Sequence, residues 1–142
     1  GTYWQASDGS RSIDLSGNKP GTMVSQSFIT NIGTQYIVKF DMAGNPDSGP
    51  VIKTVKVTGG PVSQTFTFDT TGHSRTSMGW TTKWFAFIAD NTTSTLTFES
   101  LVNNPYGPAL DNVKVDAVPI PATLWLLGAG LMGVGLMRKR LR

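Results

Sequence analysis

The sequence contains no cysteine and a single histidine, His73. The absence of cysteine excludes disulfide scaffolds, thiolate zinc sites and cysteine nucleophiles. His73 lies in a glycine-rich turn beside Ser74 and Arg75, without further ligands at metal-binding spacing, so we expect it to be a solvated turn residue. Charged residues make up only 15% of the chain, whereas glycine, threonine, serine and asparagine are abundant. This composition favours short strands and turns over helices.

The formal charge of the 142-residue chain is +3, but the excess positive charge is confined to its C-terminus. Four of the 12 basic residues lie in the last five positions, so residues 1–137 carry 8 basic and 9 acidic side chains, a net charge of −1. Binding to a nucleic-acid backbone needs cationic groups spread over a surface that follows the phosphates. Nucleic acid is therefore not an expected partner.

Residues 10–117 show a dominant apolar–polar period of two, which is typical of strands that cover a core on one side. Tyr36, Val38 and Phe40 fall on one face of their run, while Ile37 and Lys39 fall on the other. The eight clearest runs are residues 11–15, 22–29, 35–42, 51–57, 62–68, 83–89, 94–101 and 110–116. Gly, Pro, Asn and Asp clusters separate them, and no βα spacing or heptad repeat occurs. The body, residues 1–117, is predicted to be an all-β domain, an antiparallel jelly-roll β-sandwich.

The C-terminal segment, residues 118–142, has a different composition. Residues 120–137 contain no charged side chain, and 18 residues in a helix span about 27 Å, close to the thickness of a bilayer core. We therefore predict a single transmembrane helix over residues 120–137, with membrane lipid as its surroundings. The basic cluster in residues 138–142 is expected to stop transfer of the chain through the membrane, which predicts a cytoplasmic C-terminus. It consists of Arg138, Lys139, Arg140 and Arg142.

A short motif begins just before this predicted helix and overlaps its start, namely Val118, Pro119, Ile120, Pro121 and Ala122. The order of proline motif, short apolar helix and basic cluster resembles a PEP-CTERM sorting signal, in the variant with an aliphatic residue in place of the central Glu. This resemblance implies recognition and processing by an exosortase in an exopolysaccharide-producing Gram-negative bacterium. It also implies passage through the inner membrane to the cell surface or extracellular matrix. A permanent single-pass anchor in the inner membrane is the alternative.

Several phrases in the body carry a second resemblance. They are Tyr3-Trp4-Gln5, Ala43-Gly44-Asn45-Pro46-Asp47, Phe66-Thr67-Phe68-Asp69-Thr70-Thr71-Gly72, Met78-Gly79-Trp80 and Tyr106-Gly107-Pro108-Ala109-Leu110-Asp111-Asn112-Val113. Together they resemble the choice-of-anchor C family of exported bacterial β-sandwich proteins, which are similar to galactose-binding-like domains. The resemblance implies that an export signal and a first strand precede the Tyr-Trp-Gln phrase, so we expect an N-terminally truncated chain with an open sheet edge.

The residues give little support for catalysis or for a cofactor. Asp41 and Asp47 can approach each other across the Asn45-Pro46 turn, as a glycosidase carboxylate pair must. Asp and Asn side chains that cap their own backbone explain the same pattern. Asp111 resembles the last-strand position that holds a structural Ca²⁺ in jelly-roll carbohydrate-binding domains. Otherwise, Asp111 and Asn112 make structural hydrogen bonds at a strand start.

Sugar binding by such a domain uses exposed aromatic rings, with amides, carboxylates or Arg completing the hydrogen bonds. The candidate residues are Trp4, Tyr106, Asn45, Asp47 and Arg75. Trp80 and Trp84 are further aromatic candidates, although Trp80 can plug one end of the sandwich. The sequence as a whole predicts a non-catalytic, exported surface or matrix protein with polysaccharide as a candidate partner. A periplasmic carbohydrate-binding-like domain on a permanent anchor is the alternative.

Overall fold

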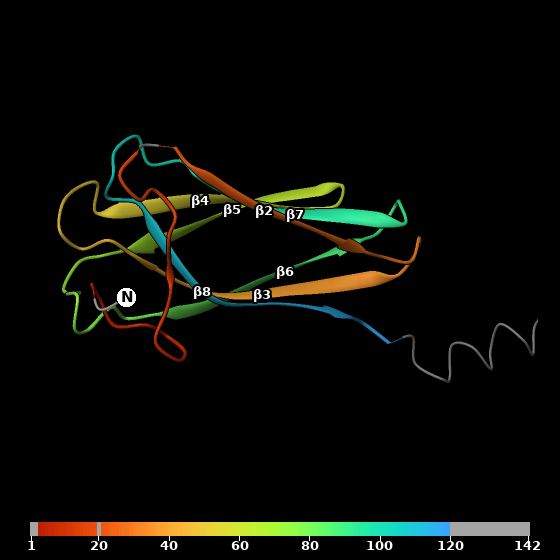
Figure 1. Cartoon of the computed structure of the whole chain (residues 1–142), viewed down its shortest axis with the longest axis horizontal. Coiled ribbons are helices and arrows are strands. Elements are labelled where there is room, and N and C mark those ends of the chain that lie inside the picture. Colours follow the sequence, from red (N-terminus) through yellow and green to blue (C-terminus); the bar gives the residue numbers. More distant parts are fainter. Residues whose placement is uncertain (1–2, 20, 120–142) are drawn as a thin grey trace, which may run out of the picture.

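Two antiparallel four-stranded sheets pack face to face and form a β-sandwich (Figure 1). The computed structural model describes residues 3–19 and 21–119. The strands are β1 (Ile13–Asp14), β2 (Met23–Ile29), β3 (Gln35–Gly44), β4 (Ile52–Gly59), β5 (Val62–Asp69), β6 (Thr81–Ile88), β7 (Thr93–Ser100) and β8 (Pro108–Ala117). Sheet A has the order β1-β8-β3-β6, and sheet B has the order β2-β7-β4-β5. The predicted sandwich of two antiparallel sheets is confirmed.

The strand pairs are nested along the chain. β4 pairs with β5, β3 with β6, β2 with β7, and β1 with β8, as in one long hairpin rolled into two layers. Additional pairing of β3 with β8 and of β4 with β7 completes each sheet. This is the arrangement of a jelly roll. It brings residues near the start of the chain beside residues near position 110.

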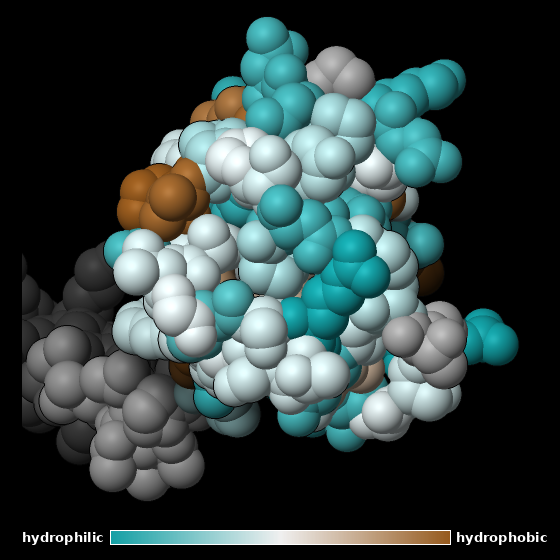
Figure 2. Space-filling view, turned by 90° about the vertical axis from the view of Figure 1, so that its left-hand side faces the viewer, coloured by the Kyte–Doolittle hydropathy of each residue, from teal (hydrophilic) through white to brown (hydrophobic). Residues whose placement is uncertain are grey.

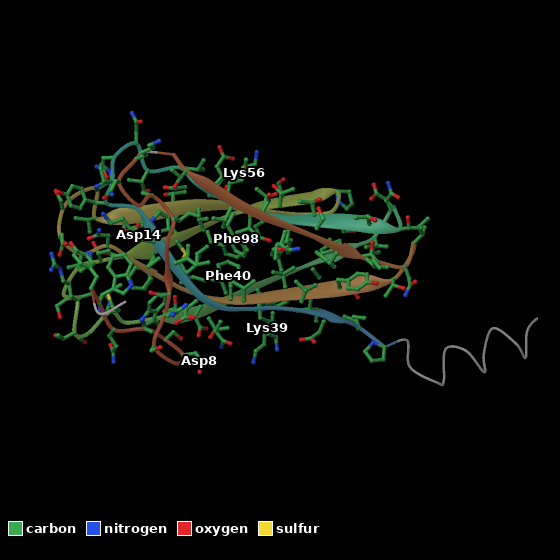
Figure 3. The ribbon with its side chains drawn as sticks, viewed as in Figure 1. Asp8, Asp14, Lys39, Phe40, Lys56 and Phe98 are labelled. Atoms are coloured by element: carbon green, nitrogen blue, oxygen red, sulfur yellow. The ribbon has the colours of Figure 1, made fainter. Side chains whose placement is uncertain are left out.

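Aromatic side chains from both sheets fill the core. Phe40 of β3 lies edge-on to Phe66 and Phe98, with ring centroids 5.2 and 5.1 Å apart. Edge-to-face contacts of this kind are a favourable geometry for aromatic pairs. Figure 3 shows Phe40 and Phe98 between the layers, whereas Lys39 and Lys56 point outward from the two sheets. The predicted inward alternation of β3 is therefore confirmed.

The first strand is shorter than predicted, with two residues where the pattern suggested residues 11–15. The preceding segment leaves the sheet edge because the Asp111 carboxylate accepts hydrogen bonds from the backbone N–H groups of Ser7 and Asp8, at 2.8 and 3.0 Å. The next residue, Asn112, has a φ of +49°, and the β3–β8 register shifts nearby. A local irregularity in β8 thus redirects the N-terminal segment.

Sheet A has an open edge along the second half of β8. In the part of the chain that the structure describes, β8 pairs with β1 only at Ala109 and Leu110 and otherwise with β3. Between this edge and β2 lies an apolar gap of about 260 Å³. Val24 and Val113 border the gap and are each 38% exposed.

The sandwich continues to the start of the proline motif. β8 ends at Ala117, and the Val118 N–H donates a hydrogen bond to the Gln35 carbonyl at 2.8 Å. Ile120, Pro121 and Ala122 of the motif, the predicted helix over residues 120–137 and the basic cluster lie outside the described residues. Within residues 3–19 and 21–119, no helix is long and apolar enough to cross a membrane.

Candidate functional site

Four segments far apart in the sequence meet at one end of the sandwich. They are residues 3–18, the 45–50 loop, the 71–80 loop and the 101–107 loop, which gather on the left in Figure 1. Figure 2 looks onto this end and shows a mostly hydrophilic surface. Loops supported by a rigid sandwich are common positions for binding residues. We call this region the loop end.

A charged network connects three of these segments. The Arg75 guanidinium donates hydrogen bonds to both carboxylate oxygens of Asp47, at 2.8 and 2.6 Å, and to the Tyr3 hydroxyl at 2.7 Å. The Tyr3 hydroxyl also donates to Asp47. The guanidinium carbon lies 4.0 Å from the centroid of the Tyr3 ring. Hydrogen bonds from Arg75 hold the pKa of the Asp47 carboxyl below its usual range. The network fixes Tyr3 without help from a sheet.

Hydrogen bonds of the Asn104 side chain also hold the loop that carries Tyr106. The Tyr106 N–H donates to the Asn104 side-chain oxygen at 2.8 Å, and the Asn104 amide donates to the Gly49 carbonyl at 2.8 Å. Gly107 has no room for a side chain, because a Cβ there would lie 1.8 Å from the buried Ser16 hydroxyl oxygen. Tyr106 remains 36% exposed on this fixed loop. It is therefore preorganised for contact with a ligand.

A groove of about 320 Å³ lies between the two tyrosines. Asp14 and Asn18 supply polar groups to it, and burial raises the pKa of the Asp14 carboxyl. The groove is lined by Tyr3, Asp14, Gly17, Asn18, Asn45, Pro105 and Tyr106. Aromatic walls with amide and carboxylate groups between them can bind a sugar through ring stacking and hydrogen bonds to hydroxyls.

The five predicted sugar-binding residues all lie at the loop end, but two of them are buried and three are exposed. Trp4 is nine-tenths buried, and its indole N–H donates to the Ser12 hydroxyl at 2.7 Å. Asn45 is also buried, and its side-chain oxygen accepts the Asp47 N–H at 3.0 Å. These two residues support the loops, and little of the Trp4 side chain is exposed for stacking. Arg75, Asp47 and Tyr106 remain accessible.

The prediction omitted Tyr3 and Asp14, although both line the groove. Tyr3 is 52% exposed, and its ring lies edge-on to Trp4 with centroids 5.3 Å apart. The Tyr-Trp-Gln phrase contained a signal for this residue in its type alone, because Tyr3 is a second aromatic residue beside Trp4. Asp14 carried no signal beyond its place at a strand end.

Asp111, the residue predicted as a possible calcium ligand, accepts hydrogen bonds from backbone N–H groups. One carboxylate oxygen accepts the Ser7 and Asp8 N–H groups, and the other accepts the Asn112 N–H at 2.7 Å. The alternative prediction of structural hydrogen bonds is therefore confirmed. Nowhere in the described ranges do three or more His, Cys, Asp or Glu residues lie close enough together to hold a metal ion.

The Asp41 and Asp47 carboxylates have separate partners. Asp47 is bound by Arg75 and Tyr3 at the loop end. Asp41 lies on sheet A and accepts hydrogen bonds from the Ser7 hydroxyl and from the Thr82 hydroxyl, the latter at 2.7 Å. Burial raises the pKa of Asp41, but these hydrogen bonds outweigh it, so the net shift is downward. The two carboxylates share no hydrogen-bonding partner.

Two aromatic predictions from the 71–80 region can be compared with the structure. His73 was expected to be solvated, but its ring packs on Phe68, with centroids 5.3 Å apart, and lies directly under Gly79. The side chain is half-buried and so only partly solvated, because a glycine without a side chain admits the imidazole. Trp80 packs against the core, and its indole N–H donates to the Gln5 carbonyl at 2.9 Å, which confirms its place at an end of the sandwich.

Solved carbohydrate-binding domains share this fold. The C-terminal domain of EclA, described as a sugar-binding protein, aligns with a TM-score of 0.58 and 15% identity, over 80% of this chain and 82% of that one. A family 16 carbohydrate-binding module aligns at 0.55 and 19% identity, over 78% and 79%. A family 35 module from an environmental isolate aligns at 0.54 and 14%, over 83% and 86%. At these identities, the similarity establishes the fold alone.

Two further comparisons concern the sequence. Halomucin of Haloquadratum walsbyi is 30% identical over 118 residues, which is 81% of this chain. The chain spans only 1% of the length of halomucin. A family model described as "Protein of unknown function (DUF642)" matches residues 1–116.

Proposed function

We propose that this chain, which belongs to the DUF642 family of proteins of unknown function, is a non-catalytic protein that binds polysaccharide at its loop end. The observation that carries the proposal is the groove between Tyr3 and Tyr106, with polar side chains between two fixed aromatic rings. The likeness of the fold to carbohydrate-binding modules supports it.

The chemistry of the groove favours binding over turnover. Glycoside hydrolysis needs two carboxylates on opposite sides of one glycosidic bond. Asp14 lines the groove, whereas Asp47 is engaged with Arg75 and Asp41 lies on sheet A. A sugar can instead stack on Tyr106 and donate hydroxyl hydrogen bonds to Asp14 and Asn18. Binding of this kind requires no cofactor.

Binding of the full-length chain to an array of polysaccharides tests this proposal. Tyr106→Ala is expected to lower the affinity for a bound glycan about tenfold or more, because it removes the exposed ring. Tyr106→Phe keeps the ring and should retain most of the affinity. Circular dichroism and thermal unfolding verify that both variants fold. The proposal fails if no polysaccharide binds, or if Tyr106→Ala binds like the wild type.

We further propose that the C-terminal segment is a sorting signal processed by an exosortase, so that the domain reaches the surface or matrix of a Gram-negative bacterium. The support is the order of proline motif, apolar run and basic cluster in residues 118–142. Intact-mass measurement of surface material tests it, and mature chains still ending at Arg142 would refute processing. Persistent co-fractionation with inner membranes in the presence of the exosortase would favour the permanent anchor.

A further inference from the structure

The second half of β8 presents unpaired backbone groups along the open edge of sheet A. The Val118 N–H donates to the Gln35 carbonyl, so this N–H points toward β3. Along an antiparallel strand, backbone groups point alternately to one side and to the other. Counting back from Val118, the N–H and C=O groups of Val115 and Ala117 and the carbonyl of Val113 point away from β3. Within the described ranges, no strand pairs with β8 along this stretch.

This free stretch is limited at both ends. β1 pairs with β8 only at Ala109 and Leu110. Asn112, with a φ of +49°, lies where the β3–β8 register shifts and separates that part of the edge from the rest. After the end of β8, Pro119 has no N–H and cannot continue a ladder. Residues 113–117 are therefore a short edge to which one further strand can be added.

The edge strand of sheet B leaves these residues uncovered. Phe28 of β2 lies edge-on to Tyr36 of β3 and to Phe87 of β6, with ring centroids 6.3 and 6.4 Å apart. This end of β2 therefore lies over β3 and β6, while β8 continues past it toward the C-terminus (Figure 1). Within residues 113–117, Val115 is half-buried and the other four residues are exposed.

The sequence of this stretch is complementary to itself in an antiparallel pairing. With a two-fold axis at Val115, Lys114 of each copy lies directly opposite Asp116 of the other. Val115 packs against the core, so Lys114 and Asp116 point to the outer face, where opposite charges at directly opposed positions are stabilising. On the inner face, Val113 of each copy lies opposite Ala117 of the other.

We infer that residues 113–117 are the interface of a homodimer, in which the A sheets of two copies join edge to edge into one continuous sheet. The Val115 N–H and C=O exchange hydrogen bonds with the same groups of the second copy. The Ala117 N–H donates to the Val113 carbonyl of the second copy. The pairing also covers Val113, which is 38% exposed beside the apolar gap near β2.

The dimer has a consequence for function that rests on the proposed sugar binding at the loop end. β8 begins at the loop end, directly after the 101–107 loop, and its second half runs away from it (Figure 1). Because the two copies of β8 run antiparallel, their loop ends point in opposite directions. A dimer with one groove at each end can bind two polysaccharide chains and link them.

Disulfide cross-linking tests the register, since the chain has no cysteine of its own. Full-length Lys114→Cys and Asp116→Cys chains are mixed in a mild detergent and oxidised. The mixture should form at least about fivefold more linked dimer than either variant alone, because only the 114–116 pairs are directly opposed, and the 114–114 and 116–116 pairs are diagonal at about 7–8 Å. Lys56→Cys, on the outer face of sheet B, is the control and should form no linked dimer with Lys114→Cys.

Exchange of the charges tests the complementarity, with analytical ultracentrifugation of the full-length chain as the assay. Lys114→Glu places like charges opposite each other twice and should weaken dimerisation about tenfold or more. The double variant Lys114→Glu, Asp116→Lys exchanges the two charges and should restore it. Lys56→Glu makes the same change of charge away from the edge and should dimerise like the wild type. Thermal unfolding verifies that each variant folds.

Several results would overturn the inference. One is equal cross-linking in the mixture and in the single variants, which indicates random collision. Another is a double variant that dimerises no better than Lys114→Glu. In hydrogen exchange, protection of the Val115 and Ala117 amides should rise with protein concentration. Protection independent of concentration would assign the edge to a segment of the same chain. Loss of glycan binding in Tyr106→Ala, in contrast, concerns the loop end and leaves dimerisation unchanged.

Discussion

Replacement of the buried Lys53 by methionine is expected to stabilise the protein. Lys53 lies on β4 in the inward-facing series that continues with Val55 and Val57, and its exposed fraction is 0%. Its ammonium group donates one hydrogen bond, to the Ser48 carbonyl at 2.7 Å. Burial lowers its pKa from the ordinary value. In the described part of the chain, no carboxylate forms an ion pair with it.

The magnitude follows from two opposing contributions. Removing an ammonium group from water costs several kcal/mol, and a hydrogen bond from a charged donor returns about 1.5–3 kcal/mol. Methionine has a similar length and loses only that hydrogen bond, and the Ser48 carbonyl lies in an exposed loop where water can replace the donor. We therefore expect Lys53→Met to raise the unfolding free energy by about 1–3 kcal/mol, or the melting temperature by about 4–12 °C.

Urea unfolding of the full-length chain at several pH values measures this effect. Because the folded-state pKa of Lys53 is lowered, the unfolded state holds the proton to higher pH, and wild-type stability rises as the pH approaches the ordinary lysine value of about 10.4. The advantage of Lys53→Met should shrink over the same range. Lys56→Met, on the outward face of the same strand, should change stability little at any pH. A Lys53→Met variant that is no more stable than the wild type at neutral pH would refute the reasoning.

Two other variants test the loop end. Gly79→Ala should destabilise the fold by about 1–3 kcal/mol more than Gly72→Ala. Both glycines have positive φ, but only at Gly79 would a Cβ collide with the His73 ring, at 2.1 Å; equal losses on denaturation would contradict the packing of His73. Asp47→Asn should lower stability by about 0.5–1 kcal/mol at neutral pH, since Asp47 and Arg75 are partly exposed. Because the pKa of Asp47 is lowered in the folded state, its carboxylate stabilises the fold at pH values above the unfolded-state pKa of about 3.9. The stability difference between Asp47→Asn and the wild type should therefore vanish as the pH falls through the folded-state pKa. A difference that stays constant with pH in unfolding measurements would exclude the ion pair as its cause.

Alternation in the sequence located the eight strands and assigned the faces of the regular ones, but it missed the short β1 and the irregularity in β8 that leaves Val113 exposed. Phe85 is inside and Trp84 outside because strand side chains alternate whatever the partner strand is. Lys53 also points inward, in phase with Val55 and Val57, against the general rule that lysine stays in water. In a strand, the period of two decides the orientation of a side chain whatever its residue type.

The partners of the candidate site residues could not be predicted in the same way. Arg75 and Tyr3 are 72 positions apart, and Arg75 and Asp47 are 28 apart. The nested strand pairing brings their loops to one end, and periodicity says nothing about which loops meet. Asn45 and Trp4 look like ligand-binding residues by type, but tertiary contacts bury both. Residue type identified the correct end of the molecule without separating supporting residues from accessible ones.

The net charge of −1 over residues 1–137 conceals an uneven use of charge in the fold. Hydrogen bonds within the sandwich engage the carboxylates of Asp41, Asp47 and Asp111, whereas Lys39 and Lys114 face solvent without a partner in the described residues. Hydrogen bonds from hydroxyl and backbone N–H donors do not cancel the negative charge of a carboxylate. In sheet A the directly opposed Asp41 and Asp111 lie on one side of the directly opposed Lys39 and Lys114, and Asp116 lies on the other side. The outer face of sheet A therefore has charges of both signs and no excess of cations for a nucleic-acid backbone, which needs several cationic groups along one surface.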